Sequence, residues 1–268
     1  MKVIFNADDF GLTQGVNNGI VQSHKEGVVL STTLMVGSCK EEHAVMLSKG
    51  LPNLKVGLHL RFTTGSPLTL HSCLQAKPAE ENNKTNSGKV HGRNGQFPNQ
   101  TEFWEKRDYD PLAVYEEVVA QVEHFLNLGI KLSHIDSHHH AHTHPQIGPV
   151  VEKVAKQYQV PLRGLGVDAN GDLALRYLFT DEFYDKNVDL ELLVSHLVSL
   201  KSGYDIVEVM CHPAYVDAHL ESLSSYCTQR VAELNVLTDP RLKQRLDLHG
   251  IEVTDYSVLD VMRKIDCV

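Results

Sequence analysis

Short apolar runs alternate with amphipathic helical stretches along this sequence, and that alternation limits the folds open to it. Residues 3–5, 56–60 and 206–210 are short apolar segments bounded by turn residues, as buried strands are. Apolar residues recur at helical spacing after Asp110 and after Pro145. Because strands that alternate with helices pair in parallel, we predict an α/β fold with mostly parallel strands, either a barrel or an open sheet.

The other predicted elements continue the pattern, with one interruption. Strands are expected at 32–36, 131–136, near 162 and at 251–254, and helices from about 15, at 190–200, at 230–237 and at 239–248. Residues 61–107 are instead rich in Asn, Gly, Lys and Pro. A loop of that length inside a compact domain is uncommon and is usually functional. We therefore interpret it as a lid on a single catalytic domain spanning residues 1–268, with a solvated surface loop as the alternative.

Polar, titratable side chains stand where the predicted strands end, and active sites of parallel α/β folds lie at those carboxyl ends. The residues concerned are, in strand order, Asp8 and Asp9, His59, Asp136 and His138, and His212. We expect them to meet at one face of the sheet. A helix cap is the alternative for the Asp8-Asp9 pair, and a buried histidine bonded to the backbone is the alternative for His212.

The segment HIDSHHHAHTHP carries the strongest signal. Six polar residues share one parity, namely His134, Asp136, His138, His140, His142 and His144. An extended chain would place them on one side, where imidazole and carboxylate together suit a divalent metal ion. Because Pro145 is expected to open a helix, we expect His142 and His144 to lie in a loop, where they would contact the substrate, support a metal ligand or lie exposed. A surface tract that binds metal adventitiously is the alternative.

Together these residues form a set suited to hydrolysis. Asp9, His59 and His138 would hold a metal ion, which lowers the pKa of a bound water. Asp8 would accept the proton of that water, and His212 would protonate the leaving group. The same residues could hydrolyse amides, esters or phosphoesters, so they do not by themselves identify the bond that is hydrolysed.

Composition and charge limit the partners and the cellular compartment that we expect for this chain. The net charge of −9 and the pI near 5.9 argue against a nucleic-acid partner and against membrane contact through a basic patch. The five cysteines are scattered without a C-x-x-C pair, which favours a reducing compartment over a disulfide framework. The N-terminus carries an acidic pair where a signal peptide needs its apolar run, so we expect a cytoplasmic protein.

Several motifs resemble those of a known family, the YdjC-like carbohydrate deacetylases, which include chitooligosaccharide deacetylases. The main motifs are NADDFG at 6–11, GLHL at 57–60, HIDSHHHAH at 134–142 and EVMCHPAY at 208–215. Three further matches follow in the expected order, STTLMV at 31–36, TTGSPL at 63–68 and R-x-x-E-L-x-x-L-T-D at 230–239. The resemblance covers nearly the whole chain.

The resemblance implies a distorted (β/α) barrel of the polysaccharide-deacetylase type. It implies removal of N-acetyl groups from sugars such as chitooligosaccharides or N-acetylglucosamine derivatives, and a homodimer. It also implies one divalent ion, Mg²⁺, although the ligand chemistry would equally accept Zn²⁺. Asp9, His59 and His138 match the metal ligands of the family, and Asp8 matches its base. The polar stretch 75–103 is expected to shape the sugar pocket, which leaves the sugar open, phosphorylated sugars included.

Two competing functions stay open at this point. A metal-dependent phosphoesterase, or another amidohydrolase, would use the same residues. A phosphate substrate favours clustered Arg or Lys, for which Arg61 and Arg163 are the candidates near the motifs. A non-catalytic metal- or sugar-binding protein is the second alternative, and the complete set of polar residues argues against it.

Overall fold

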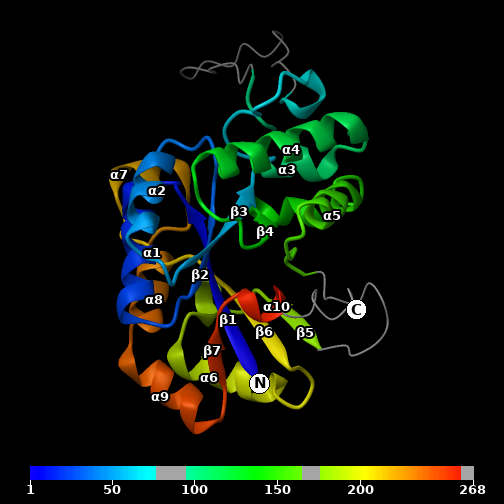
Figure 1. Cartoon of the computed structure of the whole chain (residues 1–268). Helices are drawn as coiled ribbons and strands as arrows, with labels where there is room; N and C mark the ends of the chain where they lie inside the picture. The colour runs from blue at the N-terminus through cyan, green and yellow to red at the C-terminus, as the bar shows by residue number, and fades with distance from the viewer. Residues whose placement is uncertain (77–94, 165–175, 261–268) are drawn as a thin grey trace.

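The computed structural model describes residues 1–76, 95–164 and 176–260 (Figure 1). Its strands are β1 (Lys2–Phe10), β2 (Ser31–Leu34), β3 (Lys55–Leu60), β4 (Ile135–Ser137), β5 (Tyr177–Thr180), β6 (Ile206–Cys211) and β7 (Glu252–Thr254). Its α-helices are α1 (Gln14–Glu26), α2 (Glu41–Lys49), α3 (Gln100–Glu105), α4 (Pro111–Asn127), α5 (Gly148–Gln157), α6 (Leu190–Leu200), α7 (Ala218–Leu223), α8 (Thr228–Leu237), α9 (Pro240–Leu248) and α10 (Ser257–Asp260). Short 3₁₀ helices are η1 (Ser72–Leu74), η2 (His138–Thr143) and η3 (Asp185–Asn187).

The strands form one parallel sheet with β1 at its centre. The order is β4-β3-β2-β1-β6-β5, and β7 pairs with the start of β1. One edge of β1 pairs with β6 from Lys2 to Ala7. The other edge pairs first with β7, at Lys2–Ile4, and then with β2, at Asn6–Phe10. This curled parallel sheet with helices outside it confirms the predicted α/β class and the distorted barrel.

Helices cover the outside of the sheet in groups that follow the chain. Figure 1 shows α1 beside α2 and α8 on one flank, α4 beside α5 on another, and α6 beside α9 near the N-terminus. The helix predicted after Asp110 begins at Pro111, because the Asp110 carboxylate accepts a hydrogen bond from the Leu112 amide and Pro at the first position suits a helix start. Its inner face buries Val114, Val118 and Val122 in the core.

Local pattern placed some elements wrongly. The helix expected from Pro145 begins at Gly148, because the chain first forms the 3₁₀ helix η2. The segment near Leu162 makes only an isolated bridge with Ile135, whereas strand β5, which local pattern did not indicate, pairs with β6. Part of the 61–107 excursion is regular, since the side chain and backbone of Asn99 form a capping box with Glu102 at the start of α3.

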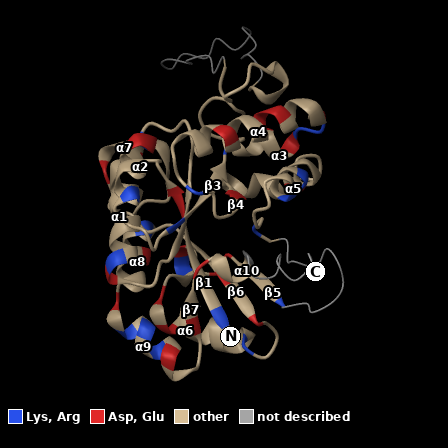
Figure 2. Ribbon diagram, viewed as in Figure 1, with Lys and Arg blue, Asp and Glu red and all other residues tan. Residues whose placement is uncertain are grey.

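The described surface carries both signs of charge. Lys and Arg are interspersed with Asp and Glu along the outer helices, as on α9 (Figure 2). Helices in the described part of the chain all fall short of the length and apolar character that a membrane crossing requires.

Candidate active site

The two acidic residues of β1 reach the same cavity because the strand is irregular there. Asp9 has a left-handed φ of 69°, and the register between β1 and β2 shifts between Ala7 and Phe10. Neighbours on a regular strand face opposite sides of the sheet, so the irregularity allows Asp8 and Asp9 to line one cavity. A non-glycine residue in this conformation is strained, and such strain collects at functional sites.

Of the six residues predicted from the strand ends, Asp136 contacts His59 without lining the cavity. The other five line a cavity of about 300 Å³. They are Asp8, Asp9, His59, His138 and His212. β3 supplies the first histidine, and the other two directly follow β4 and β6. The carboxyl ends of parallel strands therefore converge as expected. The excursion contributes Thr64 and Gln100 to the lining, whereas its residues 77–94 lie outside the described part of the chain.

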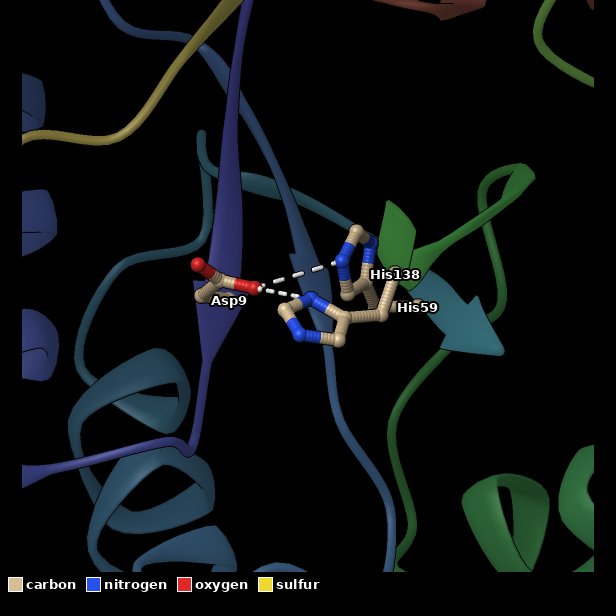
Figure 3. Close-up of side chains that lie close together, drawn as sticks. All are labelled: Asp9, His59 and His138. Carbon is tan, nitrogen blue, oxygen red and sulfur yellow. Dashed lines mark ion pairs between the residues drawn. The ribbon is translucent and has the colours of Figure 1, made fainter. Parts of the chain in front are cut away.

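Three of these side chains point at one position (Figure 3). Oδ1 of Asp9 lies 3.0 Å from Nδ1 of His138 and 3.3 Å from Nε2 of His59. One ligand atom from each residue falls within 4.8 Å of the others. Among the described residues, Oδ1 of Asp9 is buried and accepts no well-formed hydrogen bond. Atoms placed in this way fit a shared metal ion better than a shared proton.

Asp136 orients His59 from the side opposite this position. Nδ1 of His59 lies 2.7 Å from Oδ1 of Asp136, while Nε2 faces Asp9. The hydroxyl of Thr33 donates to Oδ2 of Asp136 at 3.0 Å. A carboxylate that accepts one ring proton leaves the other nitrogen as a ligand lone pair. Burial lowers the pKa of His59, but Asp136 and Asp9 raise it to about 10, so the site is built to hold positive charge.

Asp8 is held by a buried arginine. Arg163 donates from Nη1 and Nη2 to the two carboxylate oxygens of Asp8, each at 2.7 Å. The same guanidinium donates from Nε to Glu208 at 2.8 Å. Burial alone would raise the pKa of Asp8, but Arg163 outweighs burial and lowers that pKa. Asp8 is therefore a fixed carboxylate anion.

Asp9 is held in turn by Arg230, whose Nη2 donates to Oδ2 of Asp9 at 2.7 Å. Burial raises the pKa of Asp9, whereas Arg230 and His138 lower it well below its ordinary value. Four buried carboxyl groups, Asp8, Asp9, Asp136 and Glu208, thus share two guanidinium groups, Arg163 and Arg230. Negative charge remains in excess, which a divalent cation would offset.

The carboxylate of Glu233 lies next to His212. The backbone amide of His212 donates to Glu233, and Nδ1 of His212 lies 3.9 Å from Oε1 of Glu233. Glu233 is fully buried, and Oε1 also accepts the hydroxyl proton of Tyr226 at 2.6 Å. His212 is thus not the buried, backbone-bonded histidine of the alternative, because it is only partly buried and no described residue accepts or donates a hydrogen bond at its Nδ1. Its ring lines the cavity.

The other histidines of the HIDSHHHAHTHP segment separate into two groups. His139 and His140 have left-handed φ values of 53° and 55° and line the cavity. His134, His142 and His144 are buried away from its lining. Nδ1 of His142 bonds to Ser137, and His144 packs among the aromatic residues Phe103, Trp104 and Tyr109.

Sequence reasoning missed the residues that hold the predicted ones in place. Arg163 was considered only as a phosphate-binding candidate, yet it is fully buried in ion pairs. Arg230 and Glu233 both belong to the motif at 230–239, to which no role was assigned. Their spacing of one helical turn, on the buried side of α8, was the available signal.

Comparisons with known proteins show the family to which this chain belongs. The model of the YdjC-like protein family matches residues 2–248. A carbohydrate deacetylase of Vibrio campbellii is 58% identical over 98% of this chain and 98% of its own length. A carbohydrate deacetylase of Geobacillus stearothermophilus is 39% identical over 94% of this chain and 96% of its own.

Two solved structures share the fold. One is a protein from Enterococcus faecalis V583 with a suggested role in cellobiose-phosphate cleavage. It is 30% identical, has a TM-score of 0.80, and matches 96% of this chain and 98% of its own. The other is a mutant of a CE4-family pseudoenzyme with restored activity. It is 10% identical with a TM-score of 0.50, over 97% of this chain and 67% of its own, which is evidence for the fold alone.

Proposed function

We propose that this chain, which belongs to the YdjC-like family, is a metal-dependent hydrolase that removes N-acetyl groups from sugars such as chitooligosaccharides or N-acetylglucosamine derivatives. Its activity class, carbohydrate deacetylation, is that of full-length relatives with more than half of their residues identical. The observation that carries the proposal is the convergence of Asp9, His59 and His138 beside the fixed carboxylate of Asp8.

Each residue around the cavity has a separate role in the proposed amide hydrolysis. A divalent ion bound by Asp9, His59 and His138 would polarise the acetyl carbonyl and make a bound water more acidic. Asp8, held by Arg163, accepts the proton of the attacking water. His212, on the cavity wall formed after β6, donates a proton to the departing sugar nitrogen. Asp136 keeps the Nε2 lone pair of His59 directed inward.

We propose that the site binds a single divalent ion. The chemistry of the ligands favours one metal, and the resemblance to the family implies another. Two imidazole nitrogens and one carboxylate are typical Zn²⁺ ligands, and Mg²⁺ generally prefers oxygen. The resemblance to the family implies Mg²⁺. Activity measured after the metal-free protein is reloaded with Zn²⁺ or with Mg²⁺ distinguishes the two assignments.

The competing functions have less support. Arg61 and Arg163 do not line the cavity, and among the described residues Arg230 is the one Lys or Arg that does. Because Arg230 is paired with Asp9, little positive charge is left for a phosphoester. A non-catalytic binding protein would have no need of a base and an acid in the same cavity as a metal position.

We further propose that residues 1–268 act as one catalytic domain, that the protein forms a homodimer, and that it works in the cytoplasm. Cys39, Cys73, Cys211 and Cys227 are free thiols, which suits a reducing compartment. Light scattering of the purified chain tests the dimer.

Acetate release from N-acetylglucosamine, its 6-phosphate and short chitooligosaccharides tests the function. The protein is stripped of metal and reloaded with Mg²⁺, Zn²⁺, Mn²⁺ or Co²⁺. We expect one ion to restore release and His138→Ala to abolish it. His249→Ala, at an exposed histidine outside the cavity, is the matched control. Absence of release with every sugar and ion would overturn the proposal.

A further inference from the structure

Two tyrosines form a wall of the cavity that the proposed chemistry does not use. The rings of Tyr184 and Tyr226 lie 4.2 Å apart and 3° from parallel. Each meets the His212 ring edge-on, with ring centroids 5.9 Å apart. Tyr184 is 41% exposed although it lines the cavity. Tyr226 therefore covers one face of the Tyr184 ring, while Tyr184 as a whole stays partly exposed at the cavity wall.

Hydrogen bonds hold Tyr226 and link it to the backbone beside Tyr184. The Tyr226 hydroxyl donates to Oε1 of Glu233 at 2.6 Å and accepts from the backbone amide of Asp185 at 3.0 Å. Asp185 directly follows Tyr184 and has a left-handed φ of 52°. The Tyr184 hydroxyl has no hydrogen bond within the described part of the chain. Loss of this hydroxyl would therefore break no hydrogen bond within the described part of the chain.

Arg230 brings an unpaired donor to the same wall. Its Nε donates to the Tyr226 carbonyl at 2.9 Å, and its Nη2 donates to Asp9 at 2.7 Å. Its Nη1 is buried, and no described residue accepts a hydrogen bond from it. The side chain is 5% exposed and lines the cavity. A buried donor without an acceptor is unfavourable, so a ligand oxygen would complete this arrangement.

We propose that Tyr184, backed by Tyr226, and Arg230 form a pyranose-binding subsite next to the reaction centre. The axial C–H bonds of a pyranose make one face apolar and slightly positive, which suits the negative face of an aromatic ring. Nη1 of Arg230 donates to an oxygen of the same sugar, as the few polar groups of a ligand pocket orient their ligand. The inference rests on the proposed function, and it adds that the enzyme selects cyclic sugars over acyclic acetamides.

Kinetics of Tyr184 variants test the stacking. Tyr184→Ala raises KM for diacetylchitobiose about tenfold with little change in kcat, since a ring contact of this kind is worth about one factor of ten in affinity. Tyr184→Phe retains the wild-type KM, and acyclic N-acetylethanolamine is hydrolysed equally by all three proteins. Tyr215→Ala is the control, because Tyr215 is 48% exposed but does not line the cavity. An unchanged KM in Tyr184→Ala overturns the inference.

Arg230→Lys tests whether Nη1 of Arg230 binds the sugar. It also distinguishes this role from the contact between Arg230 and Asp9. The lysine keeps a positive charge but cannot serve two acceptors in a fork. We expect a KM for diacetylchitobiose about tenfold higher, with the bound metal per chain unchanged by elemental analysis. Loss of metal together with activity would show that Arg230 acts through Asp9 alone and would remove it from the subsite.

Ligand NMR makes the inference independent of turnover. With N-acetylglucosamine and the wild-type chain, saturation of aromatic protons should transfer most strongly to the axial ring protons on one sugar face. Tyr184→Ala should abolish that preference. Such transfer without acetate release from any sugar would keep the subsite while the proposed function fails. Acetate release without such transfer would overturn the subsite while the function stands.

Discussion

Arg163 meets Asp8 through two hydrogen bonds of 2.7 Å each, although the two residues are 155 positions apart in the chain. The same guanidinium lies 2.9 Å from Oδ2 of Asp136, the residue that orients His59. One buried cation, absent from the cavity lining, therefore fixes both the proposed base and the partner of a proposed metal ligand.

Replacement of this arginine should change the pH dependence of catalysis. In Arg163→Lys the fork is lost, so the pKa of Asp8 rises toward its ordinary value. Asp8 works deprotonated, so the acidic limb of the kcat/KM profile should move to higher pH, and the maximum should fall about 10–100-fold. Steady-state rates across pH measure both effects. Arg176→Lys, at an exposed ion pair with Asp205, is the control, and an equal response there would contradict the prediction.

Metal binding should release a proton. His59 has a pKa of about 10 in the metal-free site, so it is protonated near neutral pH and must lose that proton to become a ligand. Metal affinity should therefore rise with pH, up to about pH 10. Calorimetric titrations in buffers of different ionisation enthalpy count the released proton. Binding heats that do not depend on the buffer would contradict this assignment.

His59→Ala should weaken metal binding at least about 100-fold, because it removes one of three converging ligands. Equilibrium dialysis followed by elemental analysis measures the loss. His249→Ala removes an exposed histidine outside the cavity and should bind metal as the wild type does. Equal metal content in the two variants would contradict the assignment of His59 as a metal ligand.

Substitution of His212 should affect turnover without affecting metal. His212→Asn removes the proposed acid, so kcat should fall about 10²–10⁴-fold while the bound metal per chain stays the same. Glu233→Gln keeps the size of the partner but removes its charge, and should lower kcat by a smaller factor. An unchanged kcat in His212→Asn would assign the ring to packing alone.

The stability of the fold should decline in acid because of buried neutral histidines. Burial lowers the pKa of His142 to about 3. Between that value and roughly 6.5, the ordinary pKa of histidine, the unfolded state binds more protons, so stability rises with pH across this window. His142→Asn should reduce the slope by about 1.4 kcal/mol per pH unit. Urea unfolding at several pH values measures it, and an unchanged slope would refute the contribution of His142.

Local sequence was a good guide to the strands that are apolar and bounded by turn residues. The strands containing Val3, Val56 and Ile206 follow the predicted segments. The four-residue strand β5 was not predicted, because a short segment becomes a strand through its pairing with a neighbour, here β6. The start of α5 was likewise decided by the preceding η2 turn and not by Pro145.

The sequence by itself determined the parallel α/β architecture and the residues that gather at the strand ends, Asp8, Asp9, His59, His138 and His212. It did so because a parallel sheet brings all of its carboxyl ends to one face. The tertiary structure alone decided which groups hold them. Arg163 and Arg230 reach Asp8 and Asp9 across 155 and 221 positions of the chain, and Glu233 reaches His212 across 21. Such pairings depend on distance in space and on burial, neither of which local periodicity encodes.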